Sequence, residues 1–406
     1  MRICDLTMAY SETSGGIRTY IDQKRKYILQ NTDHEHVLIV PGRADAVERN
    51  GRLETHTIES PPSGHGTYRL LWRPDEVAAA LDVAKPDVIE LGTFFVCPWP
   101  AFQYRKQRRA GGDRCVVAGY FHTDIAEAYV QTPVEQWVSE RFHGWHDAVA
   151  SLGGSVADLL GLGAERYFGS LFERCDAMFA AAPDQAQRLR EYGIEKSEIV
   201  PLGVDIELFS PSKRSRFVRE RFEASEDTCL LAYVGRMDAE KHIWTVVDAY
   251  TALRDRGFDA RLVMIGDGPL VEELHSRAET TPDLTPHGYC ADPGDLAELL
   301  ASADVYVTAG PHETFGLSVI EAQAAGLPIV GVAAGALPQR VIDGTGLLGP
   351  VDDAEEMADN IVRAWERRES LSSASRRHVV DNFSWNRSFE RLLEIYRHLL
   401  GSPTTL

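Results

Sequence analysis

Short apolar segments alternate with longer amphipathic ones along the whole chain. The short segments are rich in β-branched residues, and near-continuous apolar runs of this length are typical of strands buried on both faces. They predict strands at 1–8, 36–41, 87–92, 115–121, 176–181, 198–202, 229–235, 260–265, 303–308 and 328–333. The spacing of apolar positions between them predicts helices at 75–84, 134–150, 241–256, 293–302 and 355–368. Strands that alternate with helices favour parallel sheets covered by helices on both faces.

The number of predicted strands indicates two α/β halves rather than one sheet. Sheets of more than about ten strands usually split, and a chain of 406 residues exceeds the usual size of a single domain. A polar, basic segment at 205–228 precedes the first strand of the second half and is the expected boundary. The last helical pattern, from Trp385 to Leu400, follows the last strand of the second half.

The chain carries 61 acidic and 42 basic residues, which gives a formal net charge of −19. A surface this acidic argues against non-specific nucleic-acid binding, which needs a basic footprint. The six cysteines are scattered without a Cys-x-x-Cys pair, which excludes a zinc ribbon or a thioredoxin-type motif and fits a reducing compartment. Neither a signal peptide nor an apolar run of about 18 residues is found. We therefore expect a soluble, cytoplasmic protein of two domains.

Candidate ligand-binding residues follow the strands, because ligands of open α/β sheets bind beyond the carboxyl ends of the strands. The first strand of the second half leads into Gly235 and Arg236, and a helix is predicted to begin near Lys241. Two cations beside the free amides of a helix start form a site for a diphosphate. The alternative is that both are surface cations paired with Asp238 and Glu240.

The next strand is followed by Gly266-Asp267-Gly268-Pro269 and a helix. This segment resembles the start of a dinucleotide-binding fingerprint, but Val271 stands where the third glycine belongs. A tight turn between strand and helix explains the two glycines without any ligand, and on its own this is the preferred interpretation.

The segment after the strand at 303–308 carries the most information. Gly316 permits a tight turn, and a helix is predicted from about Leu317 to Ala325, with Glu313 ahead of it and Glu321 about one turn inside. Helix amides between the two carboxylates carry partial positive charge. A phosphate with a sugar on each side would satisfy all three features. Alternatively, Glu321 faces solvent and Glu313 caps the helix.

Two segments of the first half also follow strands. Ser14-Gly15-Gly16 opens a helix after the first strand, where the glycines either let backbone amides approach a ligand or simply make the turn. His122-Thr123-Asp124 follows the strand at 115–121. A single histidine is more often structural than functional, so it is a candidate only together with the other sites.

Taken in order, these segments resemble the retaining glycosyltransferases of family 4, and the resemblance spans nearly the whole chain. The segments that carry it are Gly15-Gly16, Phe121-His122-Thr123-Asp124, Pro201–Phe209, Gly235-Arg236 with Glu240-Lys241, Gly266-Asp267-Gly268-Pro269, and Glu313 and Glu321 separated by seven residues. Each motif is modest by itself, whereas their order and spacing together are specific.

The resemblance implies the GT-B fold, in which two Rossmann-like domains face a central cleft. Residues 1–205 are then the N-terminal, acceptor-binding domain, and 206–385 are the C-terminal domain, which binds the nucleotide-sugar. Residues 386–406 are expected to cross back to the N-terminal domain.

The resemblance also assigns roles to individual residues. Arg236 and Lys241 are expected to hold the diphosphate, Glu321 the ribose hydroxyls and Glu313 the hydroxyls of the transferred sugar. His122 is expected to contact that sugar near the reacting carbon. Backbone groups and the base pocket complete the expected donor site, with contributions from Gly15, Gly16, Gly266, Tyr289, Cys290, Phe315, Gly316 and Leu317.

The implied reaction moves a hexosyl unit from a UDP- or GDP-linked sugar to an acceptor hydroxyl with retention of configuration. Cations and helix amides can stabilise the leaving diphosphate without a metal, and the chain has no Asp-x-Asp motif for a metal clamp. No metal or other cofactor is therefore expected. Front-face attack through an oxocarbenium-like state needs no protein nucleophile, and none is assigned.

The acceptor is left open among a glycan, a lipid and a small molecule. The basic, aromatic stretch 101–109 would suit weak contact with an anionic membrane at its inner face, as in relatives that glycosylate lipids. A solvated helix face explains the stretch equally well. The aromatic-rich segment 127–172 is either a helical insertion on the acceptor side or core.

Other function classes remain as alternatives. A nucleotide-sugar epimerase or hydrolase of the GT-B fold, or a non-catalytic sugar-nucleotide-binding protein, would use the same donor site. A Rossmann dehydrogenase is disfavoured by the missing third glycine, and an exported sugar-binding protein by the missing signal peptide. Hydrolase chemistry has no support, because neither Gly-x-Ser-x-Gly nor His-Glu-x-x-His occurs.

Overall fold

The computed structural model describes residues 1–10, 16–62, 69–94, 98–122, 163–313 and 315–401. Gly15, Thr123, Asp124 and the helix predicted at 134–150 lie outside these ranges. Contacts divide the chain into two compact units: unit 1 is Met1–Pro201 with Ser388–Leu406, and unit 2 is Leu202–Arg387. The domain roles inferred from the sequence stay predictions.

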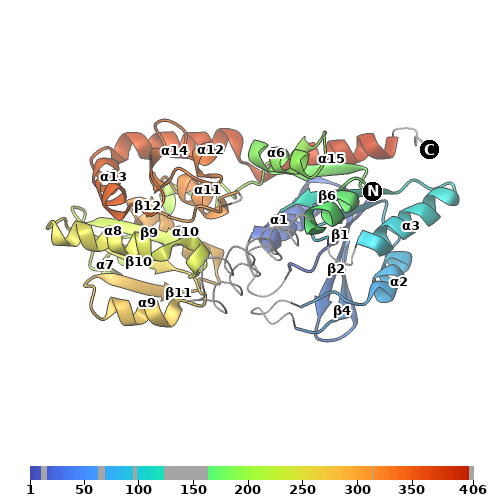
Figure 1. The fold of residues 1–406 in the computed structure, drawn as a ribbon, viewed down its shortest axis with the longest axis horizontal. Helices are drawn as coiled ribbons and strands as arrows, with labels where there is room; N and C mark the ends of the chain where they lie inside the picture. The colour runs from blue at the N-terminus through green and yellow to red at the C-terminus, as the bar shows by residue number, and fades with distance from the viewer. Residues whose placement is uncertain (11–15, 63–68, 95–97, 123–162, 314, 402–406) are drawn as a thin grey trace, which may run out of the picture. The chain divides into compact units, whose positions relative to one another are not determined.

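Unit 1 is built on one eight-stranded sheet with the order β3-β4-β2-β1-β5-β6-β7-β8 (Figure 1). Every neighbouring pair is parallel except the antiparallel pair of β3 and β4 at the edge. The strands are β1 (Arg2–Leu6), β2 (Glu35–Gly42), β3 (Ala46–Asn50), β4 (Leu53–Glu59), β5 (Val88–Leu91), β6 (Val116–Phe121), β7 (Ala177–Ala180) and β8 (Glu198–Ile199). The helices between them include α1 (Gly16–Asn31), α2 (Pro74–Ala84), α3 (Pro98–Ala110) and α6 (Pro183–Glu191).

Unit 2 is built on a six-stranded, fully parallel sheet with the order β11-β10-β9-β12-β13-β14. The strands are β9 (Cys229–Val234), β10 (Ala260–Ile265), β11 (Leu284–Gly288), β12 (Val305–Val307), β13 (Ile329–Val332) and β14 (Gly346–Gly349). The helices are α7 (Arg216–Arg221), α8 (Ile243–Asp255), α9 (Val271–Ala278), α10 (Pro293–Ser302), α11 (Leu317–Ala324), α12 (Leu337–Arg340), α13 (Ala354–Glu366) and α14 (Arg368–Asn382). Numbered from its first strand, this order is 3-2-1-4-5-6, the order of a dinucleotide-binding sheet.

The predicted elements agree with the structure where the strands are apolar. The strand at 260–265 and the helix at 293–302 have the predicted bounds, and the other described predictions differ at their ends by a few residues. Four strands were missed: β3, β4, β11 and β14. β3 is exposed along its whole length, and β4 buries Glu54 and His56 with Ile58 as its one buried apolar residue, so neither has the apolar run on which the prediction relied.

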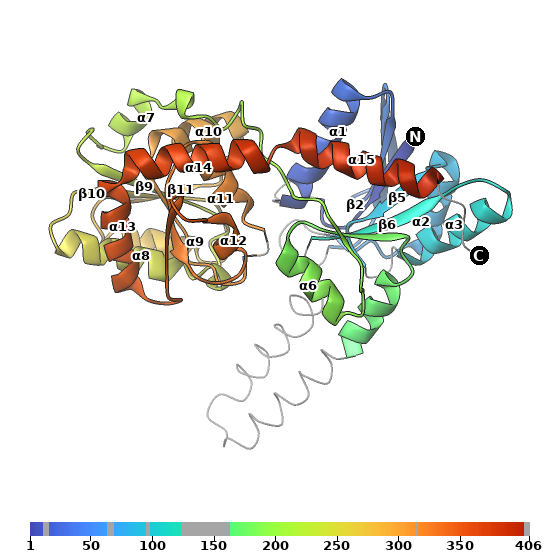
Figure 2. The ribbon, with the colours of Figure 1, turned by 90° about the horizontal axis from the view of Figure 1, so that it is seen from above.

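The last helix, α15 (Trp385–Gly401), packs on unit 1 (Figures 1 and 2). Its apolar positions, including Phe389, Leu392 and Leu393, are buried. The hydroxyl of Tyr396, which is also buried, donates a hydrogen bond to the Glu90 carboxylate at β5. The expected return of the C-terminal helix to the N-terminal half is therefore confirmed.

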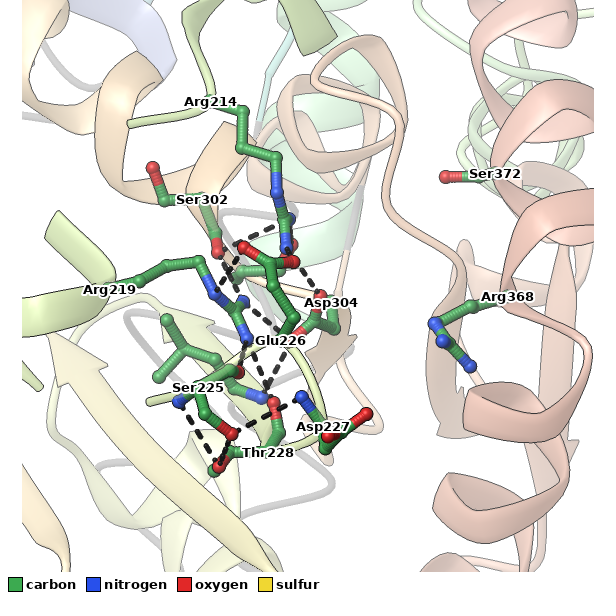
Figure 3. Close-up of polar contacts among 12 residues, drawn as sticks. Arg214, Arg219, Ser225, Glu226, Asp227, Thr228, Ser302, Asp304, Arg368 and Ser372 are labelled. Carbon is green, nitrogen blue, oxygen red and sulfur yellow. Dashed lines mark hydrogen bonds and ion pairs between the residues drawn. The ribbon is translucent and has the colours of Figure 1, made fainter. Parts of the chain in front are cut away.

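The basic segment at 205–228 folds onto unit 2 instead of remaining a solvated linker. Figure 3 shows Arg214 and Arg219 both pointing at Asp304, which lies directly before β12. Arg219 is 2% exposed, and its guanidinium donates to Asp304 Oδ2 at 2.8 Å, to the carbonyl of Ser302 at 2.9 Å and to that of Thr228 at 3.0 Å. Because Thr228 and Asp304 precede β9 and β12, this cluster lies at the amino ends of the strands.

Candidate functional site

The strand order of unit 2 places a ligand crevice between β9 and β12. β10 is the neighbour of β9 on one side and β12 is its neighbour on the other, so the strand order reverses at β9. Ligands of such sheets bind at the carboxyl ends of the strands where the order reverses. The segments that follow the two strands, 235–242 and 308–316, are the ones that the sequence motifs singled out.

Lys241 and Glu313, which are 72 positions apart, meet at this edge. Lys241 ends a short 3₁₀ turn (Ala239–Lys241) just before α8, and its Nζ lies 2.9 Å from Glu313 Oε2. About a quarter of each side chain is exposed (22% and 25%). Burial acts to raise the pKa of Glu313, but the Lys241 ammonium and the N–H groups of Gly316 and Phe315 outweigh it and lower that pKa. Glu313 is therefore an ionised carboxylate.

The backbone between Glu313 and α11 forms a turn that points amides toward this carboxylate. Gly316 has a φ of +80°, a value that glycine adopts without strain, and it directly precedes the first residue of α11, Leu317. Its N–H donates to Glu313 Oε1 at 3.2 Å. The first N–H groups of a helix have no partner within the helix and carry partial positive charge, so the turn offers an anion-binding end beside Glu313.

Arg236 makes local ion pairs. Its guanidinium contacts Glu240 Oε1 at 2.6 Å and Asp238 Oδ2 at 3.6 Å, and the side chain is 55% exposed. The alternative of surface pairing with Asp238 and Glu240 is therefore right for Arg236 and wrong for Lys241, whose partner is Glu313. A diphosphate would have to draw Arg236 away from Glu240, and its role toward a ligand stays a prediction.

The two glycines after β10 pack against the turn that carries Arg236. Gly266 has a φ of +147°, and a Cβ there would lie 1.9 Å from the carbonyl oxygen of Gly235. Gly268 has a φ of +157°, and its Cβ would lie 2.4 Å from the carbonyl oxygen of Met237. The tight-turn interpretation of these glycines is sufficient, because any side chain would push the two turns apart. Whether Gly266 also contacts a donor is not tested.

Glu321 presents a carboxyl group without a hydrogen-bond partner in the described part of the chain. It lies on α11 and is partly exposed. Burial raises its pKa to about 8, so it is largely protonated at neutral pH. A carboxyl group without a hydrogen-bond partner among the described residues is suited to form hydrogen bonds with ligand hydroxyls.

Tyr289 and Cys290 follow β11 at the same edge. The Tyr289 ring is 54% exposed, and the Cys290 thiol contacts the carbonyl oxygen of Asp292 at 3.4 Å. The carbonyl oxygen of Gly288 accepts from the N–H of Gly266 at 2.9 Å, which ties the end of β11 to the glycine turn. An exposed aromatic ring next to the crevice is compatible with the expected base pocket, which remains a prediction.

His122 follows β6 in unit 1, and its ring contacts two tyrosine rings. Its ring lies parallel to that of Tyr120, with centroids 4.1 Å apart and planes at 8°, and meets the Tyr20 ring edge-on at 5.0 Å. Burial and the Lys24 charge lower the pKa of His122 to about 3. The imidazole is therefore neutral at physiological pH and can exchange hydrogen bonds without adding charge. Gly16 is exposed at the first position of α1.

A buried ionic network, which the sequence analysis did not predict, supports the Tyr20 ring that contacts His122. Lys24 of α1 places its Nζ 2.8 Å from both Asp5 and Glu90, and all three side chains are buried. The hydroxyl of Tyr20 donates to Glu90 at 3.0 Å. Burial, only partly offset by the Lys24 charge, raises the pKa of Glu90 to about 7. A lysine on the buried face of α1, among Tyr20, Ile21, Tyr27 and Ile28, was the available signal.

The basic stretch 101–109 lies on α3, and its three arginines are ion-paired. Arg105 and Arg109 both bind Asp176, at 2.8 and 2.9 Å, and Arg108 lies 3.2 Å from Asp113. These pairs favour the interpretation as a solvated helix face. None of the helices described here is long and apolar enough to cross a membrane. Among the described residues, no three His, Cys, Asp or Glu side chains converge as a metal site, and metal independence stays a prediction.

Two family models match the chain. Residues 14–208 match the model described as Glycosyltransferase Family 4, and residues 228–367 match the model described as Glycosyl transferases group 1. Together they include the segments after β1, β6, β9, β10 and β12 that carry the candidate residues.

Two curated relatives from Mycobacterium tuberculosis match nearly end to end. One is a GDP-mannose-dependent alpha-(1-6)-phosphatidylinositol dimannoside mannosyltransferase, 30% identical over 406 aligned positions that cover 97% of this chain and 95% of the relative. The other is a GDP-mannose-dependent alpha-mannosyltransferase, 35% identical over 392 positions that cover 93% and 91%. Among solved structures, a sucrose-phosphate synthase from Thermosynechococcus elongatus superposes with a TM-score of 0.75 at 19% identity, covering 99% of this chain and all of that one.

Proposed function

Because this chain belongs to glycosyltransferase family 4 and has the GT-B fold of that family, we propose that its nucleotide-sugar donor is GDP-mannose. The observation that carries the proposal is the match to two GDP-mannose-dependent relatives over nearly the full length of the chain. The Lys241–Glu313 pair at the start of α11 supports a site for a sugar diphosphate. As a glycosyltransferase it would then move a mannosyl unit to an acceptor hydroxyl.

In the proposed reaction, Lys241 and the first amides of α11 stabilise the leaving diphosphate. The bond between the anomeric carbon and the diphosphate oxygen breaks, and the acceptor oxygen bonds to that carbon on the same face. The acceptor proton passes to the departing phosphate oxygen, so no protein nucleophile is used and configuration is retained. Fixed cations and helix amides stabilise the negative charge that develops on that oxygen. Arg236 adds a second cation once it exchanges Glu240 for the diphosphate.

The two acidic residues have different proposed tasks, because their ionisation differs. Glu313 is ionised and held by Lys241, so it accepts hydrogen bonds from hydroxyls of the transferred sugar. Glu321 is largely protonated in the free protein and becomes ionised when ribose hydroxyls donate to it. The proposed task of His122 is that of a neutral hydrogen-bonding group toward the transferred sugar.

We propose that the acceptor is a lipid with a glycosylated or phosphorylated headgroup, reached at the cytoplasmic face of a membrane. The support is the relative that is named for phosphatidylinositol dimannoside. The ion pairs of α3 mean that Arg105, Arg108 and Arg109 are not free to bind lipid phosphates unless Asp176 and Asp113 release them. A vesicle-dependent activity would therefore have to use other surfaces.

The donor assignment is tested by calorimetric titration in EDTA with GDP, GDP-mannose, UDP, UDP-glucose, ADP-glucose and NAD. We expect GDP and GDP-mannose to bind without added metal and at least about tenfold more tightly than the other bases, a difference of about 1.4 kcal/mol. Preference for UDP or ADP would refute GDP-mannose but keep the donor site. Binding that requires Mg²⁺ would refute the metal-free mechanism, and transfer to acceptor rather than water separates a transferase from a hydrolase.

A pH dependence follows from the raised pKa of Glu321. In the free protein the carboxyl group is protonated below about pH 8, and ligand hydroxyls that donate to it favour the ionised form. Affinity for GDP should therefore rise between pH 7 and pH 8, level off above pH 8, and be accompanied by proton release at pH 7. Calorimetry at pH 7 in buffers of different ionisation enthalpy measures this release.

Glu321→Gln is the matched control for that titration. The variant should bind GDP more weakly, with affinity that changes little from pH 7 to pH 9 and without the extra proton release. The GDP phosphate ionises in the same way with wild type and with the variant. The difference in proton release between the two proteins therefore reports on residue 321 alone. Equal proton release in both proteins would remove Glu321 from the ribose site.

A further inference from the structure

A buried arginine, Arg340, lies behind the turn between Glu313 and α11. It ends α12 (Leu337–Arg340) and is 3% exposed. Burying a guanidinium is costly unless its N–H groups and charge are satisfied by the surroundings. No motif of the sequence includes Arg340.

The contacts of Arg340 converge on the backbone of the turn. Its Nε donates to the carbonyl oxygen of Phe315 at 2.8 Å. The guanidinium carbon lies 4.1 Å from the centroid of the Phe315 ring and 5.1 Å from that of Phe383. Both rings are buried. An arginine that donates to a carbonyl and also stacks on the ring of the same residue fixes both the position and the direction of that peptide.

The rest of the segment supports the same turn. The N–H of Ala336 donates to the carbonyl oxygen of Glu313 at 2.8 Å. Gly335, with a φ of +55°, packs so closely that a Cβ would lie 2.8 Å from that same oxygen. Arg340 is in turn held by the fully buried Gln323 of α11, whose Nε2 donates to the Arg340 carbonyl oxygen at 2.9 Å. Gly335, Ala336 and Arg340 therefore support Glu313 and Phe315 from one side.

We propose that Arg340 is a positioning residue for sugar transfer, which holds the Phe315–Gly316 peptide so that the Gly316 N–H keeps the Glu313 carboxylate facing the transferred sugar. This inference rests on the proposed function, because it takes the turn to be the part of the donor site that binds the sugar. Arg340 touches no reacting atom. Its effect passes through the peptide of Phe315, where a displacement of about 1 Å is enough to lower turnover by up to about 100-fold.

A purely structural role for Arg340 would make it equivalent to the other buried arginine of unit 2. Arg219 is 2% exposed and is held by a carboxylate and by backbone carbonyls (Figure 3). It lies at the amino ends of β9 and β12, whereas Arg340 lies against the loop at their carboxyl ends. Arg219 is thus a matched control: it is equally buried in the same unit, and its contacts are with the opposite edge of the sheet.

The test compares Arg340→Lys with Arg219→Lys. Lysine keeps the charge but loses the Nε donor and the planar face that stacks on Phe315. Both variants should have a lower unfolding temperature than wild type. Only Arg340→Lys should also lower kcat, by about 10- to 100-fold, and weaken binding of GDP-mannose about tenfold while GDP binds as in wild type. A sugar-specific loss of this kind would be absent if Arg340 only stabilised the fold.

Three results would overturn the inference. In the first, Arg340→Lys is folded and keeps wild-type kcat and GDP-mannose affinity. In the second, Arg219→Lys shows the same sugar-specific loss. The third result applies if Arg340→Lys does not fold. The variant Phe383→Leu keeps the hydrogen bond from Arg340 to Phe315 but removes one of the two rings that contact the guanidinium. Unchanged kcat and GDP-mannose affinity in this variant would overturn the inference.

The same titrations separate this inference from the donor assignment. If the wild-type protein prefers another base, GDP-mannose is refuted as the donor. Arg340→Lys and Arg219→Lys are then compared with the nucleotide and the nucleotide-sugar of that base. Wild-type protein that binds no nucleotide-sugar overturns both. Wild-type protein that binds GDP-mannose, together with an unaffected Arg340→Lys variant, overturns the positioning role alone.

Discussion

Replacing Lys241 by methionine is expected to lower kcat/KM by about 1,000-fold, the upper end of the loss seen when one preorganised charge-stabilising donor is removed from a site. The ion pairs place Lys241 beside the start of α11, because its Nζ lies 2.9 Å from Glu313 Oε2. Methionine keeps the apolar stem, so the packing of the Lys241 side chain against Gly310 is preserved. The measurement is steady-state transfer from GDP-mannose, with GDP affinity determined in parallel.

The loss should appear mainly in kcat and less in GDP binding. Negative charge grows on the leaving phosphate oxygen as the glycosidic bond breaks, so a fixed cation gains more interaction in the transition state than in the bound donor. Lys213→Met is the control, because this lysine ends a surface turn of the same unit and is exposed. A Lys241→Met enzyme within about threefold of wild type would place the diphosphate elsewhere.

Sequence reasoning could assign the candidate donor-site residues of unit 2 to one end of the sheet, because these residues follow strands that the sequence marks clearly. β9, β10 and β12 are short apolar runs, so the residues after them could be assigned to one edge of a parallel sheet. What the sequence could not supply is the pairing at that edge. Arg236 and Lys241 looked alike as cations near Asp238 and Glu240, yet Arg236 pairs locally and Lys241 pairs with a residue 72 positions away.

Strand β4 and the ionic network around Lys24 were missed for a common physical reason. Both depend on buried polar or charged groups that are satisfied only in the folded structure, such as Glu54 and His56 in β4 and Lys24 in α1. Patterns of apolar residues cannot anticipate such groups, because each is buried at a cost that its partner offsets. Arg340 belongs to the same class, and its partner is a backbone carbonyl, which has no signature in the sequence.

Unit 1 shows how such a network can serve a functional group. Glu90 accepts hydrogen bonds from Lys24 and Tyr20 of α1 and from Tyr396 of α15. Tyr20 is also one of the two rings that flank His122. The Glu90 carboxyl group thus connects α1, α15 and the Tyr20 ring that contacts the His122 imidazole. The neutrality of His122 follows mainly from burial, which lowers its pKa, with a further contribution from the Lys24 charge that Asp5 opposes.

Glu313→Gln is expected to lower kcat by about 1,000-fold, because the charged acceptor for the sugar hydroxyls is lost and Lys241 is left without its counter-charge. The amide keeps the shape of the side chain and one oxygen for the Gly316 N–H, which Glu313 now binds at 3.2 Å, so the unfolding temperature should change little. GDP affinity should also change little, since the proposed contacts of Glu313 are with the sugar. The double variant with Lys241→Met tests whether the pair acts as a unit. Groups that act together are non-additive, so the double variant should be about as slow as the slower single variant. Losses that multiply to about a millionfold would instead mean that Lys241 and Glu313 act independently.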